Sequence, residues 1–220
     1  MSTLSETPLV RQATSRQNRG NHVSQFNRAS RFLLWVDAVG GFLVCTGDVV
    51  RLGQAIPGSD VELPLQADVS RLHATIRRDA GGYVLEAHRD VRVNERPIDG
   101  ATSMSDGCLV EFGKVQMRFS QPHPLSATAR LDLVSHHQTR PSTTAVLLMA
   151  ETCVLGPDSR SHVVCRQWTD EVVLARQERE LLCRASGAFE IGGVRHEKRG
   201  LATPNCRVVG ENFSLSLEQI

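Results

Sequence analysis

The sequence predicts an all-β protein that consists of two tandem β-sandwiches behind a flexible N-terminal arm. Apolar residues occur in many short runs, which turn signals built on Gly, Pro and Asp separate. Hydrophobic residues make up 40% of the chain but aromatic residues only 5%, so the core consists mainly of Val, Leu and Ile, which favour strands. The order of the runs in the first part of the chain recurs in the second. With 220 residues, the chain is long enough for two small domains.

Residues 1–30 form the predicted arm. They are rich in Ser, Thr, Gln, Asn and Arg, and their few hydrophobic residues cannot offset the entropy lost on ordering. The arginines form no compact cluster interleaved with aromatic residues, so we expect no nucleic-acid binding. We hypothesise that phosphorylation of Thr7 or Thr14 lets the arm occupy the first domain of the same chain.

Residues 31–120 are predicted to form the first sandwich. Its apolar runs are 32–36, 42–45, 49–52, 61–65, 72–76, 83–87, 91–93, 109–112 and 115–119. Turn signals such as Gly40-Gly41 and Asp106-Gly107 separate them. Within 115–119 every second residue is apolar, which is typical of a strand with one face in solvent.

Residues 121–143 are predicted to be a linker, and residues 144–220 a second sandwich. Leu52-Gly53 has a counterpart in Leu155-Gly156, and Gly113 has one in Gly210. The spacings between these glycines are 60 and 54 residues, which indicates a tandem duplication with one shortened loop. Segment 175–185 contains strong helix formers, but the repeat favours two strands joined by a turn at 177–178.

Charge and composition exclude several classes of function. The 25 basic and 24 acidic residues leave a net charge of +1, so no general attraction to nucleic acid or to a membrane surface is expected. No apolar run is long enough to span a bilayer and the N-terminus is not a secretory signal, which predicts a cytoplasmic protein. The six cysteines form no C-x-x-C pair, so we expect buried reduced thiols and no metal site.

Four short motifs carry the candidate site. They are Gly53, Ser70-Arg71-x-His73, Val93-Asn94 and the segment 106–113. The ordered set of motifs resembles the forkhead-associated (FHA) domain, a β-sandwich that binds phosphothreonine. Phosphothreonine carries about two negative charges and three acceptor oxygens, so a site that binds it needs a hydroxyl or amide donor beside a guanidinium. Ser70 and Arg71 supply both donors.

The resemblance implies a role for each motif residue. Ser70 and Arg71 would bind the phosphate, while His73 would be a buried scaffold residue that ties loops together. Gly53 would be structural. Asn94, counted with the peptide-binding residues, would hold a turn. No acid or glycine-flanked elbow accompanies Ser70 and His73, so we expect no enzyme activity and no cofactor.

The chain also departs from the family pattern. Gln54 stands where the family has an arginine, and Glu95 where it has a glycine. The loop 87–90 is short. Arg51, Arg89 and Arg92 are candidates to supply the missing positive charge. The second sandwich has no S-R-x-H motif and carries Gly192-Gly193 in place of the Val-Asn turn, which predicts a degenerate FHA-like domain.

Two functions remain open at this point. The first is an adaptor in Ser/Thr kinase signalling that binds phosphothreonine peptides. Its partner would be a phosphorylated protein or peptide, and a Ser/Thr kinase is a further candidate partner. The second is a phosphorylation-independent scaffold that holds proteins together and has a decayed phosphate site. The sequence leaves the kinase, the peptide preference, the oligomeric state and the orientation of the two domains undetermined.

Overall fold

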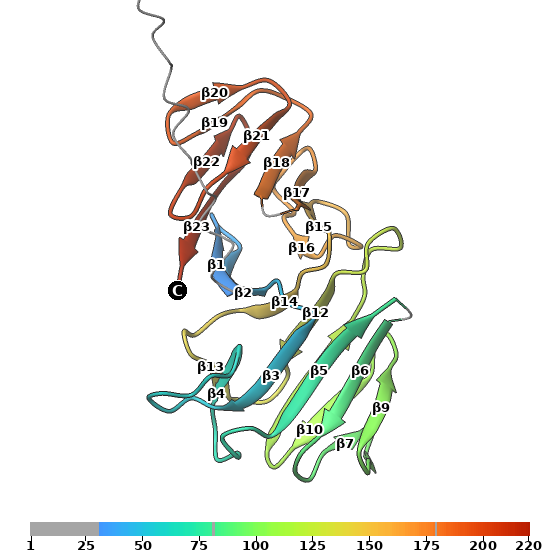
Figure 1. Cartoon of the computed structure of the whole chain (residues 1–220). Helices are drawn as coiled ribbons and strands as arrows, with labels where there is room; N and C mark the ends of the chain where they lie inside the picture. The colour runs from blue at the N-terminus through green and yellow to red at the C-terminus, as the bar shows by residue number, and fades with distance from the viewer. Residues whose placement is uncertain (1–30, 81, 179) are drawn as a thin grey trace, which may run out of the picture.

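The computed structural model describes residues 31–80, 82–178 and 180–220, and every regular element in these residues is a strand (Figure 1). This confirms the predicted all-β class. Residues 1–30, with Thr7 and Thr14, lie outside the described residues, as does the prediction that they form a flexible arm. Among the described residues there is no helix with the length and hydropathy that crossing a membrane requires.

A central sheet of twelve strands runs through the described part of the chain. In spatial order its strands are β20 (Val194–His196), β19 (Phe189–Ile191), β22 (Arg207–Gly210), β23 (Ser214–Gln219), β1 (Arg31–Val36), β2 (Gly40–Cys45), β14 (Ala145–Leu148), β12 (Ala129–Leu133), β11 (Val115–Ser120), β10 (Leu109–Phe112), β7 (Arg92–Val93) and β8 (Arg96–Pro97). At its centre, β2 and β14 pair in parallel.

Two smaller sheets pack on the central sheet. The first has the order β13 (Gln138–Thr139), β4 (Leu63–Gln66), β3 (Val49–Gln54), β5 (Ala74–Asp79), β6 (Gly82–Ala87) and β9 (Ala101–Met104). The second has the order β16 (Val163–Val164), β15 (Thr152–Gly156), β17 (Val172–Gln177), β18 (Glu180–Ala185) and β21 (Arg199–Ala202). We call each small sheet, with the adjoining half of the central sheet, the first and the second sandwich.

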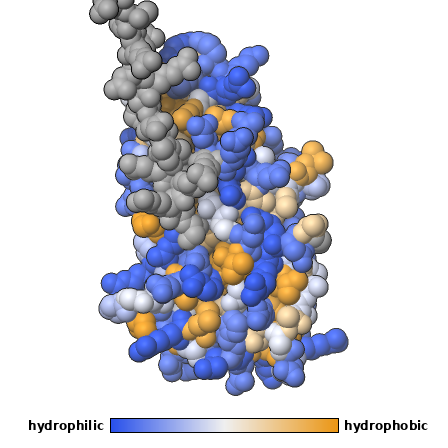
Figure 2. Space-filling view, viewed as in Figure 1, coloured by the Kyte–Doolittle hydropathy of each residue, from blue (hydrophilic) through white to orange (hydrophobic). Residues whose placement is uncertain are grey.

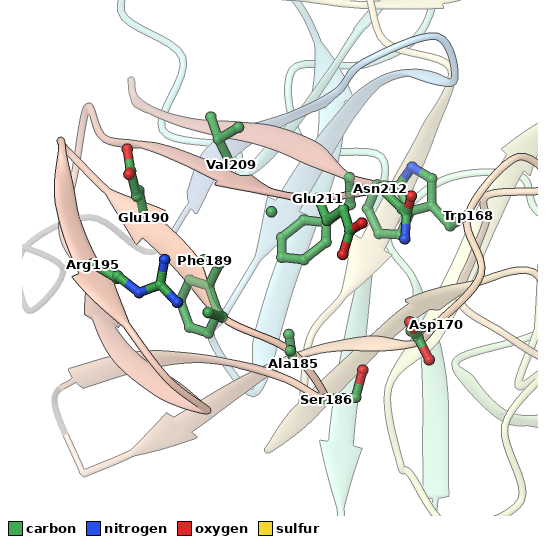
Figure 3. A pocket seen from close by; sticks show the side chains of 14 residues that line it. Trp168, Asp170, Ala185, Ser186, Phe189, Glu190, Arg195, Val209, Glu211 and Asn212 are labelled. Carbon is green, nitrogen blue, oxygen red and sulfur yellow. The ribbon is translucent and has the colours of Figure 1, made fainter.

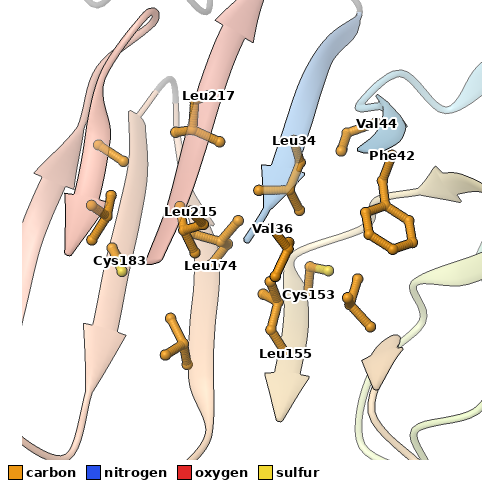
Figure 4. Packing of buried hydrophobic residues seen from close by; sticks show 14 of the residues in the cluster. Leu34, Val36, Phe42, Val44, Cys153, Leu155, Leu174, Cys183, Leu215 and Leu217 are labelled. Atoms are coloured by element: carbon orange, nitrogen blue, oxygen red, sulfur yellow. The ribbon is translucent and has the colours of Figure 1, made fainter. Parts of the chain in front are cut away.

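The two sandwiches have separate cores on opposite faces of the central sheet. Leu33 of β1 belongs to the first core, whereas its neighbours Phe32 and Leu34 belong to the second. Successive side chains of a strand point to opposite faces, so β1, β2 and β14 are covered on both sides. Figure 4 shows Leu34 and Val36 packing with residues of the five-stranded sheet and of β23. Apart from Arg31 at the start of β1, these three strands consist of apolar residues, as strands covered on both sides require.

Apart from β13, each strand of the first sandwich has a counterpart in the second. Ala74 pairs with Ala87 between β5 and β6, and Val172 pairs with Ala185 between β17 and β18. Both members of the second pair lie 98 residues after their counterparts, and the same spacing relates the paired residues of β6–β11 to those of β18–β23. Single hydrogen bonds repeat as well: Asn94 N–H donates to the carbonyl of Leu109, and Gly192 N–H donates to that of Arg207.

The hairpins that lead into the two small sheets have exchanged places. The β1–β2 hairpin continues into β3 of the first sandwich, but β1 pairs with β23 of the second. Conversely, β12 pairs with β11 of the first sandwich, while β14 continues into β15 of the second. The central sheet is therefore continuous, and no gap separates two domains in it.

This arrangement corrects the predicted boundaries. The stretch 121–143, expected as a linker, contains β12 and β13, because Ala129 and Leu131 pack into the first core as neighbours of β11. Residues 31–45, expected in the first domain, complete the sheet of the second sandwich. The prediction for segment 175–185 is right: β17 and β18 are joined by a tight turn at Glu178.

The described surface is mainly polar. Figure 2 shows a largely hydrophilic face with small, separate hydrophobic spots. Isolated exposed apolar residues are normal for a folded protein. All six cysteines are buried and unpaired, as predicted.

Candidate functional site

The candidate site lies on loops of the first sandwich, where the end of β3 meets the segment that precedes β5. Gln54, the last residue of β3, donates its backbone N–H to the carbonyl of Ser70 (3.0 Å). A Cβ at Gly53 would lie 1.9 Å from the carbonyl oxygen of Arg71. Only glycine permits this close approach of two backbones. The structure thus brings Gly53, Gln54, Ser70 and Arg71 together.

His73 holds this segment in place from below. Its ring is buried, packs against Phe112 at a centroid distance of 5.2 Å, and accepts the backbone N–H of Ser70 at Nδ1 (3.2 Å). That acceptor role leaves the proton on Nε2, which donates to the carbonyl of Asp90 (3.1 Å). His73 therefore links the Ser70 loop to the loop between β6 and β7.

The donors needed for an anion remain available at the surface. The Ser70 hydroxyl and the exposed Arg71 guanidinium make no hydrogen bond or ion pair with any described residue. Among the described residues, the backbone N–H of Arg71 also has no acceptor, whereas the backbone N–H of Ser70 donates to the His73 ring. A hydroxyl, a guanidinium and one backbone donor thus lie next to each other on a fixed backbone.

Arg51 is engaged elsewhere. Its guanidinium bonds to Glu62 through Nη2–Oε1 (2.7 Å) and Nε–Oε2 (3.1 Å), and its backbone N–H donates to Oε2 (2.8 Å). Burial opposes ionisation of Glu62, but the hydrogen bonds from Arg51 outweigh it and lower the pKa of the carboxyl. Glu62 thus already neutralises the Arg51 charge. The sequence offered no signal for Glu62, since its contact with Arg51 depends on the pairing of β3 with β4.

The other predicted residues lie on the loop between β6 and β7, on β7 and on the turn after it. Arg89 donates its backbone N–H to the carbonyl of His73 (3.2 Å), so its exposed side chain starts from a loop beside the site. Arg92 lies on β7 in the central sheet. Asn94 occupies the β7–β8 turn with φ +50°, and its Oδ1 accepts the backbone N–H of Leu109 (2.9 Å). Asn94 therefore holds a turn, and its side-chain oxygen is already hydrogen-bonded to β10.

The equivalent loop of the second sandwich has different chemistry. In the register of the strand pairs Leu52–Ala74 and Leu155–Val172, the residues Ser70, Arg71 and His73 correspond to Trp168, Thr169 and Glu171. Gly156, the counterpart of Gly53, faces the side chain of Glu171, 2.9 Å from an added Cβ, instead of a carbonyl. The hydroxyl–guanidinium pair is absent from this described loop.

The residues of the candidate site fall within a match to one protein family. The FHA domain family matches residues 50–113, which include every motif residue from Gly53 to Asn94. No curated protein matches the chain. An FHA domain is thus found in the first sandwich, around the loops described above.

Similar solved structures include three chains. The FHA-2 domain from a Mycobacterium tuberculosis ABC transporter has 18% identity, with 62% of this chain and 97% of that chain covered and a TM-score of 0.33. Mycobacterium tuberculosis EmbR in complex with a low-affinity phosphopeptide has 27% identity, 41% and 24% coverage and a TM-score of 0.32, so this chain spans about a quarter of EmbR. The FHA domain of an Arabidopsis thaliana hypothetical protein has 15% identity, 56% and 87% coverage and a TM-score of 0.29.

Proposed function

We propose, from the FHA domain at residues 50–113, that this protein is an adaptor that binds phosphothreonine peptides in Ser/Thr kinase signalling. The observation that carries the proposal is the pair of unengaged donors at Ser70 and Arg71 on a backbone held by Gly53 and His73. Binding to a rigid site avoids the cost of ordering loops on association.

The chemistry of these donors matches a phosphate monoester. The Arg71 guanidinium offers two parallel N–H donors to two phosphate oxygens, and the Ser70 hydroxyl and the Arg71 backbone N–H serve the third. Gln54 adds a neutral amide, which is half-buried and makes no side-chain hydrogen bond with any described residue. A charge-assisted hydrogen bond is worth about 1.5–3 kcal/mol. Because Gln54 stands in place of an arginine, this site should bind a phosphopeptide more weakly than a site with two guanidinium groups.

We further propose that the second sandwich is a degenerate FHA-like domain. The repeated strand order and the 98-residue spacing support a common origin, whereas Trp168, Thr169 and Glu171 replace the phosphate donors. The alternative function, a phosphorylation-independent scaffold, is favoured by one observation: the Arg51 charge is already neutralised by Glu62, so Arg71 has no second cation committed to the phosphate.

Fluorescence polarisation tests the proposal. A labelled degenerate peptide library with a central phosphothreonine should bind the full chain, and its unphosphorylated twin should bind at least tenfold more weakly. Ser70→Ala combined with Arg71→Ala should abolish this preference. Arg184→Ala removes an exposed arginine of β18 and is the matched control, which should leave binding unchanged. Equal affinity for the two libraries would favour the scaffold instead.

A further inference from the structure

The second sandwich has a cavity among the loops that correspond to the Ser70 loop and its neighbours in the first sandwich. It has a volume of about 460 Å³ and is lined by the segments that precede β17, join β18 to β19, and join β22 to β23. Figure 3 shows Trp168 and Asp170 on one side, Glu190 and Arg195 on the other, and Glu211 between them. A cavity of this size suits one long side chain and its flanking backbone.

Two residues at this end differ between the sandwiches: Gly210 stands at the position of Phe112, and Phe213 at that of Val115. In the first sandwich Phe112 packs against His73 beneath the Ser70 loop. The position 98 residues later is Gly210, and a Cβ there would lie 2.1 Å from the ring of Phe213. Phe213 therefore covers the place that Phe112 would fill. Its ring lies 5.4 Å from that of Trp168 and 6.2 Å from that of Phe189, so three aromatic side chains form the apolar wall.

The charge around this end is reversed relative to the first sandwich. The carboxylates that line the cavity belong to Asp170, Glu190 and Glu211. Their counterparts 98 residues earlier are Leu72, Arg92 and Gly113, none of which is acidic. Conversely, Arg71 and Arg89 of the first sandwich are replaced by Thr169 and Gly187.

None of the three carboxylates is neutralised within the described part of the chain, where no ion pair involves them. Asp170 accepts a hydrogen bond from the Thr169 hydroxyl (3.0 Å), which in turn accepts one from the Asn212 amide (3.0 Å). Arg195, the lining cation, is paired with Glu197 outside the cavity (3.2 Å). The cavity thus combines an aromatic wall with three carboxylates and one guanidinium, which leaves it with a net negative charge.

We propose that this cavity binds an arginine side chain from an unphosphorylated segment of a partner protein. A guanidinium stacks on aromatic faces and donates in its plane to carboxylates, and the partly exposed ring of Phe213 and the rim of Glu190 and Glu211 offer both kinds of contact. A phosphate would meet three like charges here and only one opposite charge, that of Arg195. The second sandwich thereby reads a positive charge where the first reads a negative one.

The two tryptophans of the chain report on this binding separately. Trp168 lines the cavity, whereas Trp35 lies on β1 with its indole N–H bonded to Glu218 (2.8 Å). The ¹⁵N-labelled full chain is titrated with the acetylated and amidated peptide Gly-Gly-Arg-Gly-Gly, and with a twin that carries citrulline, the neutral isostere of arginine. Trp35→Phe assigns the two indole signals. The arginine peptide should shift the Trp168 signal in a saturable way and leave that of Trp35 in place.

Substitutions identify the site. Glu190→Gln with Glu211→Gln should weaken arginine-peptide binding at least about fivefold, which corresponds to about 1 kcal/mol. Glu180→Gln, an exposed position of β18 outside the cavity, should have no effect. Ser70→Ala with Arg71→Ala should also have none, which separates this proposal from the phosphopeptide site. Equal shifts with arginine and citrulline, no saturable shift of Trp168, or unchanged binding by the double glutamine variant would overturn it.

Discussion

The two sandwiches satisfy one backbone requirement with opposite side-chain chemistry. In the first, the backbone N–H of Arg51 on β3 donates to the Glu62 carboxylate (2.8 Å). In the second, the equivalent N–H of Val154 on β15 donates to Nδ1 of the buried His162 (2.9 Å). Glu62 and His162 occupy the same position because they precede the equivalent residues Leu63 and Val163. The backbone N–H at this position needs an acceptor, and either a charged carboxylate or a neutral imidazole can supply it.

The turns between the outer strands show the same freedom. The β7–β8 turn places Asn94 and Glu95 at φ +50° and +67°, whereas the β19–β20 turn places Gly192 and Gly193 at φ +57° and +83°. Both are the left-handed geometry of a tight hairpin. Backbone shape is thus retained where residue chemistry has changed, so the shared fold alone does not make both sandwiches phosphate readers. Five experiments test how far this equivalence extends.

The largest effect is expected from separating the sandwiches. A fragment of residues 144–220 lacks β1 and β2, and with them Phe32, Leu34, Val36, Phe42 and Val44 of the second core. Each such side chain contributes about 1.5–3 kcal/mol when buried, so together they contribute about as much as the whole net stability of a typical domain, which is about 5–15 kcal/mol. The fragment should show no cooperative thermal transition in calorimetry. A chain in which residues 31–45 are joined by a flexible linker to residues 144–220 should regain one, because it restores β1 and β2 beside β14. A cooperative transition of 144–220 alone would refute the exchange.

The next effect concerns the two equivalent glycines. Gly53→Ala should lower the free energy of unfolding by about 3 kcal/mol or more, because the new Cβ meets a backbone carbonyl that cannot move without displacing Ser70 and Arg71. Gly156→Ala should cost less, about 1–2 kcal/mol, because its closest contact is with the flexible side chain of Glu171, and the backbone Cα of Glu171 lies farther away, at 3.3 Å. Urea unfolding at neutral pH measures both. Equal losses would mean that the two loops are equally constrained.

Acid should destabilise the second sandwich before the first. Burial, aided by His123, lowers the pKa of His162 from 6.5 to about 4. Between these values the unfolded chain binds the proton and the folded one does not, so stability falls as the pH drops from 6.5 to 4, by at most about 3 kcal/mol. The Glu62 carboxyl, whose pKa is lowered from 4.5, loses its contribution only below that pH.

Two neutral variants separate these pH ranges. His162→Gln keeps an acceptor for Val154 and should flatten the dependence of the unfolding free energy on pH between 6.5 and 4. Glu62→Gln should leave that range unchanged and flatten the dependence below 4.5. Urea titrations at a series of pH values measure both. An unaltered slope in His162→Gln would show that His162 is already solvated.

A smaller effect is expected at the ends of β3 and β15. Gln54→Arg should tighten phosphothreonine-peptide binding about tenfold, because it adds a charge-assisted hydrogen bond beside Arg71. Pro157→Arg, at the equivalent exposed position, should leave phosphopeptide binding unchanged. Fluorescence polarisation measures both. A gain from Pro157→Arg would reveal a phosphate site in the second sandwich as well.

The smallest effect concerns the turns. Glu95→Gly should raise the free energy of unfolding by about 0.5–1 kcal/mol, because glycine adopts the observed positive φ without strain. Gly193→Glu should lower it by a similar amount. Thermal denaturation of the two variants and the parent checks both signs. A loss in Glu95→Gly would indicate that the Glu95 side chain contributes a contact worth more than the strain.

Local patterns in the sequence predicted the all-β class, many of the strands, and the segments that come together around Gly53. The expected runs 49–52 and 115–119 lie in β3 and β11, and the motif residues Gly53 and Ser70 do meet. These features depend on alternation and on turn chemistry, which a short window contains. The ion pair of Arg51 with Glu62 depends on strand pairing and could not be found in this way.

Long-range pairing explains the remaining differences. The indole of Trp35 on β1 bonds to Glu218, which is 183 residues away in the sequence. The alternation of residues in β1 would be the same if β1 paired with a strand nearer in the sequence, so the alternation does not predict this pairing. The sequence pattern also could not predict the exact register between the two sandwiches. The sequence aligns Gly113 with Gly210, but the strand pairs place Gly210 at the position of Phe112 and Glu211 at that of Gly113. Alignment on glycines was therefore one residue out.

The pairing of β1 with β23 also sets an order of events during synthesis. A ribosome releases β1 early, but the strand that completes its sheet emerges only after residues 214–219 have been made. The first core can close once β14 has emerged, while the second waits for the final strand. Until then the apolar side chains of β1 and β2 that belong to the second core lack their cover, a state prone to misassociation on which chaperones act.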